Sequence, residues 1–136
     1  MPWSMSLPAD RPWVELEYRG VVSAADLHAA FAALMGGGGD RHLFLADCRQ
    51  VEANPSPVDL LQLIERFDTT REGRRFREAI LLPRGHAADA VRFYETACLN
   101  RGFQVRVFET REAAEAWLMD LALRQPPEEA TGPSAT

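Results

Sequence analysis

Four side chains that could take part in catalysis follow one apolar segment. Asp47 and Cys48 come directly after the apolar run at residues 43–46, and Asp59 and Glu65 come shortly afterwards. Ligands of α/β proteins bind at the ends of such strands, so these groups could form a catalytic edge. A cysteine nucleophile, however, needs a histidine or a helix N-terminus to lower the pKa of its thiol. Nothing in the sequence directs such a group toward Cys48, and we interpret it as a structural residue.

The remaining histidines, cysteines and basic residues add no pattern of catalysis or metal binding. They are scattered and lack metal-site spacing: His28, His42, His86, Cys48 and Cys98. We interpret His86 as marking a helix start rather than as a base. All 15 basic residues are arginine, which excludes a Schiff-base lysine, a phosphate-loop lysine and a lysine base. We therefore predict that the protein is not an enzyme and carries no metal and no cofactor.

A strand and a helix would position Asp47 and the residues after it. The run at 43–46 is typical of a strand covered on both faces, which Asp47 would end. Ser56 then has the features of a helix N-cap, because Pro57 is favoured at the first helical position and Asp59 completes a capping box. An apolar stripe at helical spacing follows, made of Leu60, Leu63, Ile64 and Phe67.

Three further strand-helix units accompany this one. Strands are predicted at 13–19, 78–82 and 103–108, with helices beginning near residues 23, 85 and 110. The apolar strands should be central and the alternating strands at 13–19 and 104–108 nearer the edges. The pattern predicts an α/β fold with a mostly parallel sheet of four or five strands and about four helices.

The expected domain organisation has three parts. Residues 1–12 form an N-terminal segment with a possible edge strand at 3–7, and residues 13–124 form a single α/β domain. Residues 125–136 are rich in proline, glutamate, serine and threonine, which predicts a disordered tail. A chain of 136 residues is long enough to bury a core as one domain.

Charge and composition exclude several kinds of partner. The net charge of −5 argues against a nucleic-acid binder, because phosphate contact requires a basic surface. No apolar run approaches the roughly 20 residues that span a bilayer, and the N-terminus lacks the pattern of a signal peptide. Two cysteines without an evident partner fit a reducing compartment. We expect a cytoplasmic protein without a membrane span.

An arginine-rich segment is the most unusual surface feature of the sequence. Four arginines lie within seven residues: Arg71, Arg74, Arg75 and Arg77. This patch could bind an anionic lipid head group, a phosphate or an acidic partner. Exposed charge runs are usually solvated, however, and we favour a solvated loop whose charges balance nearby acids such as Asp68, Glu72 and Glu78.

Several short signatures resemble the SpoIIAA-like group. This group comprises the STAS domains (sulfate transporter and anti-sigma-factor antagonist) and related STAS/SEC14-like bacterial domains. The signatures extend from about residue 13 to residue 121, and they are Gly20 to Ser23, the strand at 43–47, Ala79 to Pro83, Asn100 to Gly102, Val107-Phe108 and Ala116 to Leu118. The resemblance implies a SpoIIAA-like fold.

The resemblance also assigns a regulatory role to one position. STAS domains of the anti-sigma antagonist type carry a serine at the start of the helix after the central strand, and a kinase-like partner phosphorylates it. Ser56 occupies that place. The family's Asp-Ser-Ser-Gly is Pro55-Ser56-Pro57-Val58 here, so both flanks depart from the family pattern. Ser56 is also sufficiently explained as an N-cap.

Two functional hypotheses remain open at this point. The first is a non-catalytic STAS-like interaction or regulatory module that docks a protein partner or a second copy of itself. The second is a domain of SEC14-like type that binds a small ligand or an anionic lipid. An apolar cavity beneath the helices would favour the second hypothesis, and a solid core with an exposed apolar helix face would favour the first.

Overall fold

The computed structural model describes residues 2–37, 41–68, 76–83, 85 and 87–124. Strands and helices alternate along the chain after an initial strand pair. In order they are β1 (Trp3–Ser6), β2 (Val14–Val21), α1 (Ala24–Gly37), β3 (Leu43–Ala53), α2 (Pro57–Asp68), β4 (Arg77–Leu81), α4 (Ala87–Asn100), β5 (Gln104–Phe108) and α5 (Arg111–Arg124). The tail predicted at 125–136 lies outside the described residues.

The strands form one five-stranded sheet in the order β1-β2-β3-β4-β5. Strand β1 is antiparallel to β2, and the other neighbours are parallel. The apolar strand β3 is the middle strand, β2 and β4 flank it, and the short β1 and β5 form the edges, so β2 lies as far from an edge as the apolar β4 does. The predicted α/β fold with a mostly parallel sheet is therefore confirmed.

Two strands are longer than the sequence predicted. Asp47 does not end β3, which continues to Ala53 because β2 continues beside it and supplies hydrogen-bonding partners as far as Val21. Strand β2 likewise continues past residue 19, its predicted end, through Gly20, which has φ of 69° and lies where the register between β2 and β3 shifts. A left-handed residue can bend a strand at such an irregularity without ending it.

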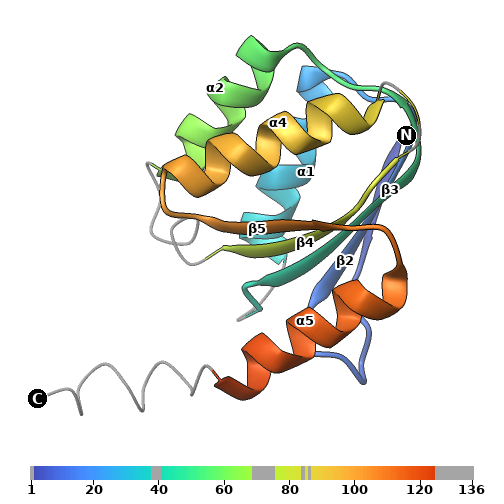
Figure 1. Ribbon diagram of the computed structural model, residues 1–136, viewed down its shortest axis with the longest axis vertical. Helices are drawn as coiled ribbons and strands as arrows, with labels where there is room; N and C mark the ends of the chain where they lie inside the picture. Colours follow the sequence, from blue (N-terminus) through green and yellow to red (C-terminus); the bar gives the residue numbers. More distant parts are fainter. Residues whose placement is uncertain (1, 38–40, 69–75, 84, 86, 125–136) are drawn as a thin grey trace, which may run out of the picture.

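The helices cover the two faces of the sheet unequally. Helices α1, α2 and α4 lie together on one face, and α5 lies alone on the other (Figure 1). Tyr18, Phe44 and Ile80 belong to the large core beneath the three helices. Trp13, Leu45 and Leu81 belong to the smaller core against α5. Alternate side chains of each central strand thus enter different cores, as the pleat requires.

Capping residues define where the helices begin and end. Ser23 and Asp26 form a reciprocal capping box, in which Ser23 N–H donates to Asp26 Oδ2 at 2.9 Å and Asp26 N–H donates to Ser23 Oγ at 3.1 Å. Thr110 Oγ1 caps α5 by accepting from Ala113 N–H at 3.2 Å. Gly102, with φ of 86°, provides a left-handed end after α4.

Helix α5 packs against the sheet through a narrow apolar face. Ala114 and Leu118 are fully buried, whereas Ala113 is exposed. Trp117 is half-buried against Phe108, with ring centroids 5.6 Å apart. Within the described ranges, every helix is too short or too polar to cross a membrane.

Candidate functional site

Ser56 caps the start of α2, as predicted, and lies on the surface. Its side chain is exposed, and its Oγ accepts a hydrogen bond from Asp59 N–H at 3.2 Å. Its carbonyl accepts from Leu60 N–H at 3.0 Å, which begins the helical ladder. The hydroxyl therefore satisfies a backbone donor of the first helical turn while remaining accessible to solvent.

Apolar residues accompany Ser56 at this end of the sheet. Val58, in the first turn of α2, is 63% exposed, and Val21, the last residue of β2, is 69% exposed. Val21 pairs with Ala53, the last residue of β3, so the strand end lies beside the loop that leads to Ser56. Asn54 in that loop donates from Nδ2 to the Ala87 carbonyl at 3.2 Å and holds the loop against the start of α4.

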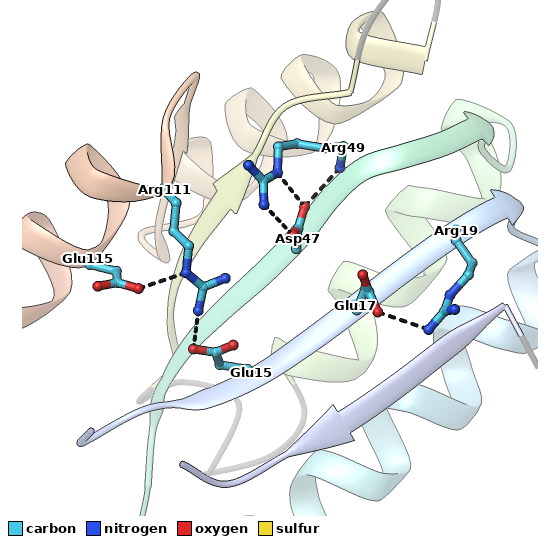
Figure 2. Close-up of polar contacts among 7 residues, drawn as sticks. All are labelled: Glu15, Glu17, Arg19, Asp47, Arg49, Arg111 and Glu115. Atoms are coloured by element: carbon cyan, nitrogen blue, oxygen red, sulfur yellow. Dashed lines mark hydrogen bonds and ion pairs between the residues drawn. The ribbon is translucent and has the colours of Figure 1, made fainter. Parts of the chain in front are cut away.

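Asp47 faces the opposite side of the sheet from the three-helix core. Figure 2 shows Arg49 folded back over Asp47 on β3, with the guanidinium donating at 3.0 and 2.8 Å and the Arg49 N–H at 3.1 Å. Burial raises the pKa of Asp47, but the hydrogen bonds from the Arg49 side chain and backbone outweigh it, so the pKa is lowered. Asp47 is therefore a paired anion in the middle of a strand.

Further charged pairs lie along the same face. Figure 2 shows Arg111 of α5 between Glu15 of β2 and Glu115 of its own helix, and the Glu115 contact is 2.7 Å long. On β2, Arg19 and Glu17 form an exposed pair at 2.9 Å. The contact between Arg111 and Glu15 joins α5 to the sheet, whereas the other two pairs lie within α5 and within β2. The charged pairs give the open part of this face a polar surface of both signs.

Cys48 projects into the large core and is chemically inert there. It is 8% exposed, and burial, followed by the charges of Glu78 and Asp47, raises the pKa of its thiol well above the ordinary value. A protonated thiol is a poor nucleophile. His28 instead lies 2.6 Å from Arg66, measured between His28 Nδ1 and Arg66 Nη1, where it joins α1 to α2. His86 lies outside the described residues.

The arginine-rich segment is described only at its end. Arg71, Arg74 and Arg75 lie outside the described residues. Arg77 is the first residue of β4, where it pairs with Leu43 on one side and Gln104 on the other. Its side chain is half-buried and donates from Nη1 to the Phe76 carbonyl at 3.1 Å. Arg77 therefore belongs to the sheet rather than to a solvated loop.

A cavity of about 70 Å³ lies between the sheet and the three helices. Its wall is mostly apolar and comes from β2, β3 and β4 below and α1, α2 and α4 above, including Leu16, Phe31, Ala46, Leu60 and Ala90. The volume exceeds the roughly 10–15 Å³ that one water needs, so the cavity has room for several water-sized groups. The helix face beneath which it lies is therefore not solidly packed, which is the feature expected for ligand binding. The exposed apolar side chains expected for docking, Val21 and Val58, lie outside the cavity wall.

Glu78 lines this cavity and does not lie on the surface. It was expected among surface acids that balance the arginines, but its residue is only 6% exposed. Tyr94 of α4 donates from its hydroxyl to Glu78 Oε1 at 3.0 Å. Burial raises the pKa of Glu78 to about 8, partly opposed by that hydrogen bond. The signal was available in the sequence, since Phe76, Glu78 and Ile80 share one face of a strand by the two-residue period.

Solved structures resemble the whole described fold. One is a protein of the DUF3478 family with a SpoIIAA-like fold from Shewanella loihica PV-4, with 18% identity, a TM-score of 0.58, and coverage of 85% of this chain and 91% of that one. Another is the anti-sigma factor antagonist SpoIIAA in its unphosphorylated form, with 11% identity, a TM-score of 0.53, and coverage of 89% and 97%. No family model and no curated protein matches the chain.

These likenesses define the class of fold. The five-stranded sheet with three helices on one face and one on the other is the SpoIIAA-like arrangement, and the resemblance predicted from the sequence signatures is confirmed at the level of the fold. The identities are low, so the roles of individual residues have to be argued from this chain itself.

Proposed function

We propose that this chain is a non-catalytic interaction module of the STAS type, which docks a protein partner through the surface around the start of α2. The observation that carries the proposal is the exposure of Ser56 beside Val58 and Val21 on a SpoIIAA-like fold. Exposed apolar side chains gathered at one end of a domain are typical of docking surfaces. Asn54 fixes the loop before Ser56, which reduces the ordering cost of binding.

The absence of catalysis is part of the same proposal. The best nucleophile in the chain, Cys48, is buried and protonated, and Asp47 is paired with Arg49. The Ser56 hydroxyl oxygen accepts the capping hydrogen bond from Asp59 N–H. A catalytic serine or cysteine requires an adjacent base that activates it. We also propose that residues 13–124 form the functional domain, with 125–136 as a tail, in the cytoplasm, where the buried free thiols Cys48 and Cys98 would stay reduced.

A charge placed at the docking surface tests the interaction. The full chain is immobilised and exposed to an extract of its source organism, and each captured protein is purified and titrated against wild type, Val58→Glu and Leu123→Glu. Leu123 is 81% exposed on α5, on the opposite face, and serves as the matched control. We expect a partner that binds wild type and Leu123→Glu alike and binds Val58→Glu at least about tenfold more weakly, since a buried unpaired charge is costly. Native mass spectrometry reports whether that partner is a second copy.

Two outcomes would contradict the proposal. The first is that all three proteins bind the same partners with the same affinities, which would remove the surface around Val58 from the interaction. The second is reproducible turnover of an esterase, phosphatase or thiol-transfer substrate that disappears when Cys48 or Ser56 is changed. Circular dichroism of each variant verifies that the fold is retained.

A further inference from the structure

The cavity beneath the three helices has the composition of a binding site for an uncharged molecule. Its wall is apolar except for a few groups, and Glu78 is the acid among them. No arginine or histidine lines it within the part of the chain that the structure describes. Arg66 is not part of the wall, and its guanidinium carbon lies 5.0 Å from the ring centroid of Phe31, which is part of it.

The carboxyl of Glu78 is arranged to donate a hydrogen bond into this space. Its Oε1 accepts the Tyr94 hydroxyl at 3.0 Å, so the proton of the neutral acid resides on Oε2. A buried, isolated carboxyl is favoured in its neutral form, because burial disfavours the charge. The other titratable groups that face it are Tyr18 of β2, Cys48 of β3, and Tyr94 and Cys98 of α4. Burial raises the pKa of each, so all of them stay uncharged.

Charge decides between the possible occupants. A carboxylate or phosphate ligand would meet an acid and no described cation in the wall. An ammonium ligand would have to lose its hydration and force Glu78 to ionise, which a single buried pair seldom repays. A neutral molecule with one hydrogen-bond acceptor requires neither, since the protonated Glu78 supplies the donor and the apolar wall supplies the contact area.

We propose that this cavity binds a small, neutral and largely apolar molecule through one hydrogen bond from the Glu78 carboxyl to an acceptor oxygen of the ligand. The expected class is a ketone or ester with a compact hydrocarbon body. This binding is separate from the docking surface at Ser56 and Val58, which lies outside the cavity wall. It also differs from anionic-lipid binding, because the recognised group carries no charge.

Two probes of the same shape test the hydrogen bond. Cyclohexanone and methylenecyclohexane differ in one group, a carbonyl oxygen or a methylene, and binding is measured by ligand-observed NMR titration at pH 6. We expect wild type to bind the ketone about fivefold more tightly, the factor that corresponds to one net hydrogen bond of about 1 kcal/mol. Glu78→Leu should lose that preference. Ala90→Leu, which fills part of the cavity, should weaken both probes, whereas the exposed Ala116→Leu on α5 should change neither.

The pH dependence of ligand binding provides a second test, in which the Glu78 side chain is kept. Between pH 6 and pH 9.5 the wild type should lose its preference for the ketone, because Glu78 ionises near pH 8 and no longer donates. Glu78→Gln keeps a donor and does not titrate, so its preference should be equal at both pH values. Circular dichroism at each pH verifies folding.

Four outcomes would overturn the proposal. They are equal binding of the two probes to wild type, no binding of either probe, tighter binding of hexanoate than of the ketone, and ketone binding that is unaffected by Ala90→Leu.

Discussion

The Tyr94 hydroxyl lies 3.0 Å from Glu78 Oε1 and joins α4 to β4 inside the core. This contact is unusual because it places the ionisable carboxyl of Glu78, 6% exposed, beneath three helices. An aspartate or glutamate is rarely buried to this extent without a charged partner. The pair therefore makes the stability of the fold depend on whether Glu78 is protonated.

Stability should fall as the pH rises through the range in which Glu78 titrates. Its pKa is about 8 in the folded protein and 4.5 by reference, so the folded state holds the proton more tightly. The stabilising contribution is complete below about pH 4.5 and is lost progressively up to about pH 8, by at most about 1.4 kcal/mol per pH unit. Urea unfolding of wild type and Glu78→Gln at pH 5 and pH 8 measures this loss. Parallel pH profiles for the two proteins would contradict it.

Ser56→Ala should destabilise the protein by about 1 kcal/mol, because the Asp59 N–H loses the acceptor at 3.2 Å. Ser56→Asp should be nearly neutral, since aspartate also caps and its charge suits a helix N-terminus. Chemical denaturation compares them with Ser6→Ala on β1, an exposed serine outside the helices. If Ser56→Ala left the unfolding midpoint unchanged while Ser56→Asp altered partner binding, regulation would explain this residue better than capping.

The two thiols should resist alkylation in the folded protein. Cys48 and Cys98 are buried, and burial raises the pKa of both, so little reactive thiolate exists at neutral pH. Titration with a thiol reagent at pH 7.5 should label both in urea and neither in buffer over the same time. Rapid labelling of Cys48 in buffer would indicate an open path to a reactive thiolate.

Leu118→Ala should cost about 2–5 kcal/mol of stability, because Leu118 is fully buried between α5 and the sheet. Leu123→Ala is the matched control, since that side chain on the same helix is 81% exposed and should change stability by less than about 0.5 kcal/mol. Thermal unfolding of the three proteins distinguishes the cases. Similar losses for both variants would mean that α5 is held differently from the packing described.

The spacing of apolar residues in the sequence was sufficient to predict the fold. The apolar run at 43–46 identified a central strand, and Ser23, Ser56 and Thr110 located helix starts that the hydrogen bonds confirm. These features are local, so one sequence can reveal them. Strand ends were less predictable, because the extension of β3 to Ala53 depends on pairing with β2, which is distant in the chain.

The buried contact between Glu78 and Tyr94 was harder to predict, because it too depends on residues that are distant in the chain. The interaction of Glu78 with Tyr94 joins residues on different elements, and its significance comes from burial that only the packed helices create. Asp47 looked like the terminus of a strand because it is the first charged residue after an apolar run. Its partner Arg49 is only two residues away in the sequence. The pairing was not predicted, because an aspartate in the middle of a strand is uncommon.

Strand β3 is paired on both sides only in its first half, and this affects how it can interact with other chains. Its ladder with β4 ends at Asp47, so within the described sheet the residues from Cys48 to Ala53 are paired through β2 alone. Such a half-paired ribbon invites strand addition by another chain, the first step of unwanted aggregation. Arg49 and Glu52 are exposed along it. Their charges oppose such pairing, because an added strand would have to lie against these charged side chains.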